Sequence, residues 1–376
     1  MLTHGGSVAH TRGAPTLRTD YGLRRHSCRR SYARLAVSKL NWFQMSPRLA
    51  VMIAAAALPA FSQDWSPRLS ADYLDSRQKE WFAWPAAKKP GGPCVSCHTG
   101  MPYLLVRPAL RRVLGESQPT QYEKGLLAGL QARAGNQEPS NLQGVEAIFS
   151  ALFLAPQNPG SPLDRLWSFQ IREGKAAGSV KWFSAGLDPW ETPDATFYGS
   201  AIAALAAGTG PAEYRDQPAV RENLNLLTGY LQREQQSQPL HNRLTLLWAS
   251  SALPAASPKP IRRTIIDEVL QKQQPDGGWT IESLGPWKPH PQAPPSTASN
   301  SYATGFVAFV LQRAGVARST PPIGRALDWL KSHQDRQSGN WPGDSMNKQY
   351  PAGSMEKRFM QDAATAFATL ALVEAR

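Results

Sequence analysis

The sequence predicts an all-α protein in which six pairs of helices, each with an outer and an inner member, close into an (α/α)6 toroid. Three observations lead to this fold class. Amphipathic segments alternate with segments rich in small residues, strand-type alternation is scarce, and a turn containing glutamine, glycine and tryptophan recurs three times. With 41% hydrophobic residues among 376, the chain can also form a substantial core.

The outer helices are predicted from apolar residues at helical spacing combined with a charged face, as in residues 261–270 (IRRTIIDEVL). Six segments share this pattern: residues 69–83, 119–135, 161–173, 217–235, 259–274 and 322–335.

The inner helices are predicted from segments that are nearly uncharged and rich in alanine, glycine and serine, as expected of helices packed closely on all sides. Pro102 and Pro108 interrupt the helical pattern of the first one. The six segments are residues 101–114, 142–155, 194–207, 240–253, 298–314 and 359–375.

The recurring turn follows an outer segment and precedes an inner one. Each copy ends a helical pattern with glutamine, turns on glycine and closes with tryptophan. The copies are Gln170 leading to Gly178 and Trp182, Gln274 leading to Gly277 and Trp279, and Gln334 leading to Gly339 and Trp341.

These turns resemble the QW repeats of squalene-hopene cyclases and the related protein prenyltransferases, whose fold is an (α/α)6 barrel. The resemblance covers residues 140–376 and, more weakly, residues 65–140. It implies a structural role for the glutamines and tryptophans of the turns. It does not imply cyclase activity, because the Asp-x-Asp-Asp acid of class II cyclases is missing, nor prenyltransferase activity, because no cysteine is free to hold zinc.

The positive charge is concentrated at the N-terminus. The net charge is +13, and residues 1–62 contribute +8 of it through nine basic side chains and one acid, Asp20. Met45 and Arg48 precede an apolar stretch, residues 49–61, that ends in small residues as a secretory signal peptide does. We therefore expect residues 1–44 to be an upstream-start artefact or a disordered leader, residues 45–62 a signal peptide, and residues 63–376 one periplasmic or otherwise extracytoplasmic domain.

This charge distribution argues against a nucleic-acid partner, because residues 63–376 carry a net charge of only +5. No run of 18 apolar residues occurs, so no transmembrane segment is expected in the mature chain.

Cys94, Cys97 and His98 form a Cys-x-x-Cys-His sequence, the attachment signature of a c-type haem. Two thiols three positions apart can form thioethers with the two vinyl groups of one haem, and the adjacent imidazole can bind the iron. The alternatives are a CxxC disulfide, half of a zinc site and a thioredoxin-like redox pair. Because Cys28 lies in the leader, no cysteine remains to complete a zinc site, and a redox pair gives His98 no role. The sequence thus predicts one covalent haem c.

The pairing of helices places residues 94–98 between the first outer and the first inner helix, so residues 63–140 carry the haem site and residues 141–376 the repeats. The haem is expected at the end of the toroid where the outer-to-inner connections gather. Two long loops, residues 276–297 and 336–358, reach the same end. The distal ligand is left open among His290, Met346, Met355, His241 and none, and a Met ligand would raise the reduction potential relative to a second His.

Three functions are compatible with such a site. The first is electron transfer through one haem to a periplasmic redox partner. The second is a haem-dependent oxidoreductase that binds an apolar or terpenoid-like molecule in the toroid, and the third is a ligand-binding or sensor module without catalysis. The second would use aromatic side chains of the inner helices, namely Phe197, Tyr198, Trp248, Tyr302 and Phe306, which equally suit a packed core.

Overall fold

The structure is a computed structural model that describes residues 65–376 except 136–141, 157–159, 194, 289 and 294–295. The described residues belong to one compact unit, Ser62–Arg376. The predicted leader (1–44) and signal peptide (45–62) lie outside the described residues.

The described part of the chain is all-α, as predicted. The segments predicted as outer helices form α2 (Pro67–Ala83), α4 (Gln121–Arg133), α6 (Gly160–Ser168), α9 (Pro218–Glu234), α11 (Lys259–Gln271) and α13 (Pro321–Ser332). Those predicted as inner helices form α3 (Gly100–Leu114), α5 (Gln143–Leu154), α7 (Ala195–Gly208), α10 (Leu240–Ala249), α12 (Ser301–Arg313) and α14 (Phe359–Glu374).

A few short elements accompany these helices. Helix α8 (Ala212–Arg215) precedes α9, and strands β1 (Lys88–Lys89) and β2 (Gly92–Pro93) form an antiparallel ribbon that pairs Lys88 with Pro93. Five 3-10 turns lie at Pro85–Ala87, Gln235–Ser237, Pro254–Ala256, Glu282–Leu284 and Glu356–Arg358. Within the described ranges, no helix is both long and apolar enough to cross a membrane.

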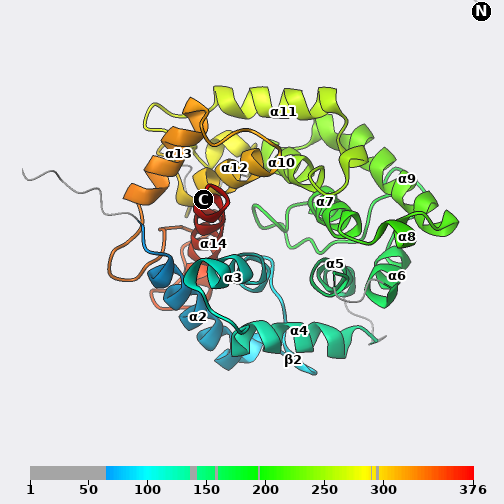
Figure 1. The fold of residues 1–376 in the computed structure, drawn as a ribbon, viewed down its shortest axis with the longest axis horizontal. Helices are drawn as coiled ribbons and strands as arrows, with labels where there is room; N and C mark the ends of the chain where they lie inside the picture. The colour runs from blue at the N-terminus through cyan, green and yellow to red at the C-terminus, as the bar shows by residue number, and fades with distance from the viewer. Residues whose placement is uncertain (1–64, 136–141, 157–159, 194, 289, 294–295) are drawn as a thin grey trace, which may run out of the picture. The chain divides into compact units, whose positions relative to one another are not determined.

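The two kinds of helix differ in burial as their compositions predict. In α7, the side chains from Ala195 to Ala207 are buried with the exception of Thr196, whereas α11 buries only Ile265 and Val269. In Figure 1, α2, α4, α6, α9, α11 and α13 lie on the outside of α3, α5, α7, α10, α12 and α14. Small side chains let the inner helices approach one another closely, and this close packing forms the core.

Inner helices contact one another in chain order, from α5 to α7, α10, α12 and α14. Helix α14, the last in the chain, then packs against α2 and α3, the first two helices of the described residues. The first and last helix pairs are therefore neighbours in space.

Helix α3 forms although two prolines lie within it. Pro102 falls in the first turn, where a backbone N–H has no intrahelical acceptor, and the helix continues through Pro108. Ser96 stabilises its start, because the Ser96 hydroxyl accepts hydrogen bonds from the backbone N–H groups of Thr99 and Gly100, each at 3.1 Å. Gly115 ends the helix in the left-handed conformation, with φ 68°.

Each of the three recurring turns follows an outer helix, α6, α11 or α13, and contacts another outer helix, α9, α13 or α2 respectively. Its glutamine Nε2 donates to the carbonyl of its own turn glycine and to a carbonyl of the following outer helix or its N-cap. That glycine has a positive φ. A Cβ added to it would lie within 2.8 Å of a second backbone carbonyl oxygen of the contacted helix, three residues after the carbonyl that accepts from the glutamine. In the first turn, Gln170 donates to Asn223 and Gly178 faces Leu226. In the second, Gln273 donates to Pro322 and Gly277 faces Arg325. In the third, Gln334 donates to Ser66 and Gly339 faces Leu69.

This geometry corrects two members of the predicted repeat. The second turn uses Gln273 rather than Gln274, whose Nε2 instead donates to the Lys272 carbonyl at 3.2 Å. In the first turn, Val180 stands where the other turns have Trp279 and Trp341. The backbone N–H of each of these three residues donates to a hydroxyl of the next inner helix, on Ser200, Thr304 and Thr365 respectively. Trp182 lies two residues further on and donates to the Trp190 carbonyl at 2.8 Å.

Candidate functional site

The Cys94–His98 segment lies between β2 and α3 and is hydrogen-bonded to the C-terminal part of α2 and the turn that follows it. The backbone N–H of Cys94 donates to the carbonyl of Ala87 at 2.8 Å, and Trp81 Nε1 donates to the carbonyl of Cys94 at 2.8 Å. These residues therefore lie in the connection between the first outer helix, α2, and the first inner helix, α3, as the sequence predicts.

Both cysteines are free thiols. Cys94 is half-buried and Cys97 is buried, and they form no disulfide. Burial raises the pKa of both thiols, and the nearby Glu191, whose Oε1 lies 3.6 Å from Cys97 Sγ, raises that of Cys97 further. A protonated pair of thiols is available for covalent attachment, whereas a redox pair would require a thiolate.

The hydrogen bonds of His98 define its tautomer. The Thr99 hydroxyl donates its single proton to Asp362 Oδ2 at 2.8 Å, so at 3.0 Å from His98 Nδ1 it can only accept. His98 therefore carries its proton on Nδ1, and within the described residues its Nε2 makes no hydrogen bond. Burial, with the charge of Arg77, lowers the pKa of His98 to about 3, which keeps the Nε2 lone pair free.

Asp362 connects the first and last helix pairs behind His98. Besides the Thr99 hydroxyl, its carboxylate accepts hydrogen bonds from Tyr73 Oη at 2.8 Å and from Arg77 Nε at 2.7 Å. The side chains of Arg77 and Asp362 are 1% and 2% exposed, so the ion pair is fully buried. It is also fully hydrogen-bonded, as a buried pair must be. The support of the imidazole thus comes from α2 and α14 together.

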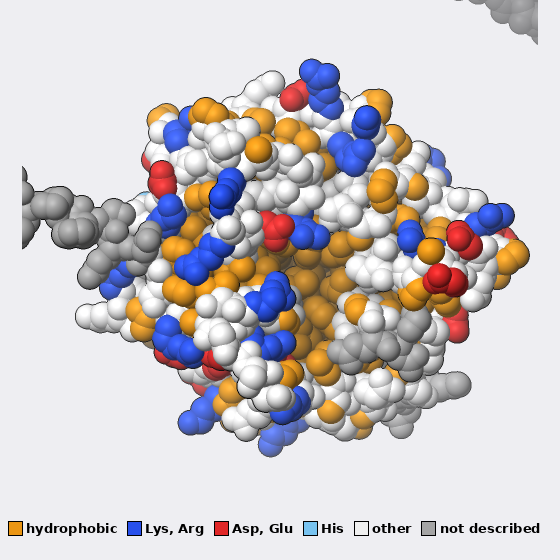
Figure 2. Space-filling model, viewed as in Figure 1, with side chains coloured by type: hydrophobic (Ala, Val, Ile, Leu, Met, Phe, Trp, Pro, Cys, Tyr) orange, Lys and Arg blue, Asp and Glu red, His pale blue; other side chains and the backbone are white. Residues whose placement is uncertain are grey.

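Aromatic rings surround the imidazole of His98. Phe359 stacks on it with ring centroids 3.5 Å apart and an interplanar angle of 17°, and Trp81 meets it edge-on at 5.7 Å. Trp190 lies 6.4 Å away on the segment between α6 and α7, which reaches the middle of the ring of helices in Figure 1. Figure 2 shows hydrophobic side chains on the floor of the hollow at the centre of the face viewed.

A second histidine, His241, lies in the core at the start of α10. Its Nε2 is 2.8 Å from Tyr302 Oη, and Trp190 Nε1 donates to the same oxygen at 3.1 Å. His241 is fully buried, and burial lowers its pKa to about 4. As placed here, His241 uses its Nε2 on Tyr302 and does not offer it to a metal.

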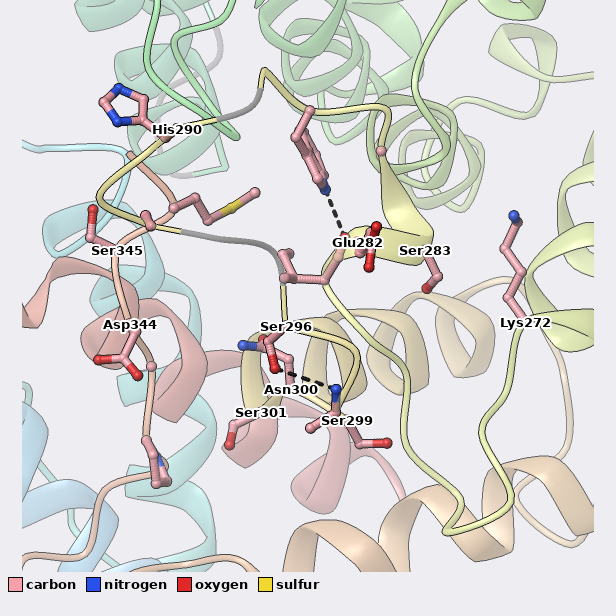
Figure 3. A pocket seen from close by; sticks show the side chains of 18 of the residues that line it. Lys272, Glu282, Ser283, His290, Ser296, Ser299, Asn300, Ser301, Asp344 and Ser345 are labelled. Atoms are coloured by element: carbon pink, nitrogen blue, oxygen red, sulfur yellow. Dashed lines mark hydrogen bonds between the residues drawn. The ribbon is translucent and has the colours of Figure 1, made fainter. Parts of the chain in front are cut away.

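The other distal-ligand candidates are in two places. Met355 is buried, and its sulfur accepts a hydrogen bond from Arg77 Nη1 at 3.4 Å. His290 and Met346 line a cavity of about 840 Å³ between the loops that precede α12 and α14, shown in Figure 3. The loop around Asp188 connects this cavity with the Cys94–His98 segment. At one end, Asp188 Oδ2 accepts a hydrogen bond at 3.2 Å from the backbone N–H of Lys288, which lines the cavity. At the other end, Trp190 lies near His98.

These residues fit the group that the motif implies. A c-type haem needs two free thiols and an imidazole whose Nε2 is unprotonated, and a hydrogen bond at Nδ1 is the usual way in which a metal-binding imidazole is oriented. Cys94, Cys97 and His98 meet these needs. Among the described side chains, no three His, Cys, Asp or Glu residues cluster closely enough to hold a metal ion by themselves, so the zinc alternative gains no support.

The aromatic side chains considered for a substrate cavity are packed instead. Phe197, Tyr198, Trp248, Tyr302 and Phe306 are at most 4% exposed. Their rings contact one another or neighbouring aromatic rings, with Tyr302 and Phe306 stacked at 5.8 Å. They form part of the core.

No family model matches the chain, and no curated protein matches it in a sequence search.

The sequence did not single out the residues that support His98. A signal for Asp362 is nevertheless present, because it is the single charged residue among residues 359–373 of a predicted inner helix. Thr99, Arg77 and Trp190 carry no comparable signal, because their roles depend on contacts between segments far apart in the chain.

Proposed function

We propose that the protein is an exported c-type haem protein that transfers electrons through one haem bound covalently to Cys94 and Cys97, with His98 as an axial ligand of the iron. The observation that carries this proposal is the pairing of two free thiols with an imidazole whose Nδ1 is anchored and whose Nε2 is free.

The finer fold assignment belongs to the same proposal. We infer an (α/α)6 toroid with the haem at its outer-to-inner end. Two observations support closure: α14 packs against α2 and α3, and Gln334 Nε2 donates to the Ser66 carbonyl at 3.0 Å, as the other turns do to their following helices.

A haem bound here would supply a one-electron couple, and its surroundings would set the potential. Thr99 and Asp362 hold the imidazole in one orientation and keep the proton on Nδ1. Phe359, Trp81 and Trp190 pack around its ring, which favours a stable axial ligand and a small reorganisation on electron transfer. The partner we propose is a redox protein outside the cytoplasm.

Covalent attachment is tested by exporting the chain in a bacterium that matures c-type haem and staining a denaturing gel for haem. We expect the wild type to stain and Cys94→Ser with Cys97→Ser to stay unstained, while His333→Ala, which changes an exposed histidine outside the motif, stains like the wild type. Haem staining that persists in the double cysteine variant would overturn the proposal.

The absorption spectrum separates an electron carrier from an enzyme with an open iron. A carrier gives a six-coordinate low-spin spectrum that carbon monoxide leaves unchanged. Rapid binding of carbon monoxide to the reduced protein would contradict electron transfer as the sole function. Spectra of His290→Ala and Met346→Ala then show whether either loop residue is the distal ligand.

A further inference from the structure

Trp190, Tyr302 and His241 form a hydrogen-bonded chain that begins beside His98 and runs into the core. The rings of His98 and Trp190 are 6.4 Å apart, and those of Trp190 and Tyr302 are 5.5 Å apart. Trp190, Tyr302 and His241 are 6%, 1% and 0% exposed, so the chain is shielded from water.

The position of each proton in this chain follows from the donors present. An indole N–H can only donate, so Tyr302 Oη accepts from Trp190 Nε1 at 3.1 Å. The single phenolic proton of Tyr302 is then directed to its other partner, His241 Nε2, at 2.8 Å. His241 consequently carries its own proton on Nδ1, which is 3.3 Å from Asn242 Oδ1.

The environment keeps both partners of this hydrogen bond neutral at rest. Burial lowers the pKa of His241 to about 4, so its Nε2 lone pair is available at neutral pH. Burial also raises the pKa of Tyr302, so the phenol does not give up its proton by simple ionisation. Proton transfer between them therefore requires a change in the charge of Tyr302.

We propose that these three residues form a redox relay that carries one oxidising equivalent from the haem site to Tyr302 when the reduced protein meets a peroxide. The proposal rests on the haem site proposed above. It adds peroxide reduction to electron transfer, so it requires a reduced iron that a small ligand can reach, which rapid binding of carbon monoxide would show. It also gives the oxidising equivalent a defined destination inside the protein.

The electrons and protons of this step balance. One molecule of hydrogen peroxide becomes two of water by taking two electrons and two solvent protons. The reduced haem that Cys94, Cys97 and His98 would hold would supply one of these electrons, and Tyr302 supplies the other through Trp190. As this electron leaves, the O–H bond of Tyr302 breaks and an N–H bond forms at His241 Nε2, which leaves a neutral tyrosyl radical beside an imidazolium. Two electrons from a redox partner complete the cycle: one would reduce the haem again, and the other reduces the tyrosyl radical as the proton returns from His241 Nε2 to Tyr302.

Tyr198 offers a matched comparison for Tyr302. It is also buried, at 3% exposed, and its ring stacks on the same imidazole at 5.6 Å. Among the described residues, however, Tyr198 makes no hydrogen bond to His241. Because its hydroxyl does not donate to His241, Tyr198 is not expected to hold the radical.

The test mixes the reduced, haem-loaded protein with hydrogen peroxide, freezes it at once and records the electron paramagnetic resonance spectrum. We expect a tyrosyl signal in the wild type, and ring-deuterated tyrosine should narrow it. The signal should be lost in Tyr302→Phe, fall in Trp190→Phe and His241→Phe, and persist in Tyr198→Phe. Haem staining of each variant checks that it has bound haem, and its unfolding in urea checks that it has folded.

Two outcomes would overturn the relay while leaving the proposed function intact: a haem-stained wild type without any tyrosyl signal, or a signal that survives Tyr302→Phe. A wild-type protein that fails to stain for haem would instead overturn the proposed function itself. The two failures are thus distinguishable in one set of samples.

Discussion

Asp362 joins three segments at the back of the proposed haem site. It accepts hydrogen bonds from Tyr73 and Arg77 on α2 and from Thr99 just before α3, while it lies itself on α14. The Arg77 guanidinium also contacts Glu80 and the sulfur of Met355. The orientation of His98 therefore depends on a buried charge pair that is distant from it in sequence.

Asp362→Asn should lower the free energy of unfolding by about 3–5 kcal/mol, because it removes the buried charged partner of the Arg77 guanidinium and leaves only the more exposed Glu80. Asp344→Asn provides the control. Its carboxylate pairs with Lys357 at 3.3 Å in an exposed position, and removing it should cost no more than about 0.5 kcal/mol. Urea unfolding of the haem-loaded proteins measures both, and equal losses would show that the Asp362 pair is not a central support.

His241 predicts a pH dependence of stability. Its pKa is lowered from 6.5 to about 4 in the folded protein, so the unfolded chain binds the additional proton below pH 6.5. The stabilisation by neutral His241 is complete above pH 6.5 and is lost as the pH falls toward 4. Between pH 7 and 5 the loss from this one group is about 2 kcal/mol.

Between pH 7 and 5, the free energy of unfolding of His241→Gln should fall by about 2 kcal/mol less than that of the wild type. His333→Gln, at an exposed position, is the control and should follow the wild-type profile. Unfolding free energies measured in urea at pH 7, 6 and 5 test whether His241 causes this pH dependence. Parallel profiles for the wild type and His241→Gln would contradict a buried neutral imidazole.

At the scale of secondary-structure elements, the sequence located all twelve predicted helices and the loop of the haem motif. The period of apolar residues and the alternation of charged with small-residue segments are local signals, and they sufficed. Helix ends were less predictable. Helix α6 ends at Ser168, well before the expected 173, because the Gln170 side chain leaves the helix to bind the carbonyls of Gly178 and Asn223.

The members of the recurring turn show where prediction from sequence stops. Gln273 and Gln274 are adjacent and chemically identical, and only the position of the Pro322 carbonyl selects Gln273. Val180 replaces tryptophan in the first turn, and its equivalence is visible only in the hydrogen bond from its N–H to Ser200. The contacts that support His98 are equally dependent on tertiary structure.

Among the residues of the third turn, Gly339 should tolerate substitution least. Its φ is 77°, and a Cβ there would lie 2.3 Å from the carbonyl oxygen of Leu69. Gly353 has a similar φ of 80° but no atom within 4 Å of the same position, which makes it a matched control. Gly353→Ala should cost about 1 kcal/mol from the backbone conformation alone.

Gly339→Ala should cost about 2 kcal/mol more than this control, because the turn must also move away from α2. The two free energies of unfolding are measured side by side in urea. If Gly339→Ala were no more costly than Gly353→Ala, the contact between the third turn and the first outer helix would not contribute to stability.

At the scale of the whole molecule, the described part of the chain begins and ends at one place. The guanidinium of Arg376 lies over the ring of Trp65, with its carbon 5.1 Å from the ring centroid, and Trp65 and Trp341 are 6.2 Å apart. Together with the hydrogen bonds from Gln334 to Ser66 and Ser70, these contacts join the last helix pair to the first. If these contacts close a toroid, the chain could begin at any pair as long as the cyclic order of the pairs is kept.

A circular permutant tests this consequence of closure. A linker of about six residues spans at most about 20 Å, which suffices to connect Arg376 to Trp65 if the ring closes there. New termini between Asp216 and Gln217 fall at exposed residues between α8 and α9 and leave the haem motif intact. The permutant, exported behind a signal peptide, should stain for haem and keep its unfolding free energy within about 2 kcal/mol of the parent domain. A second permutant opened between Val307 and Ala308, in the buried middle of α12, should fail to fold. If both permutants failed alike, the first and last pairs would not be joined as proposed, and the toroid would have to be replaced by an open arrangement of the same helices.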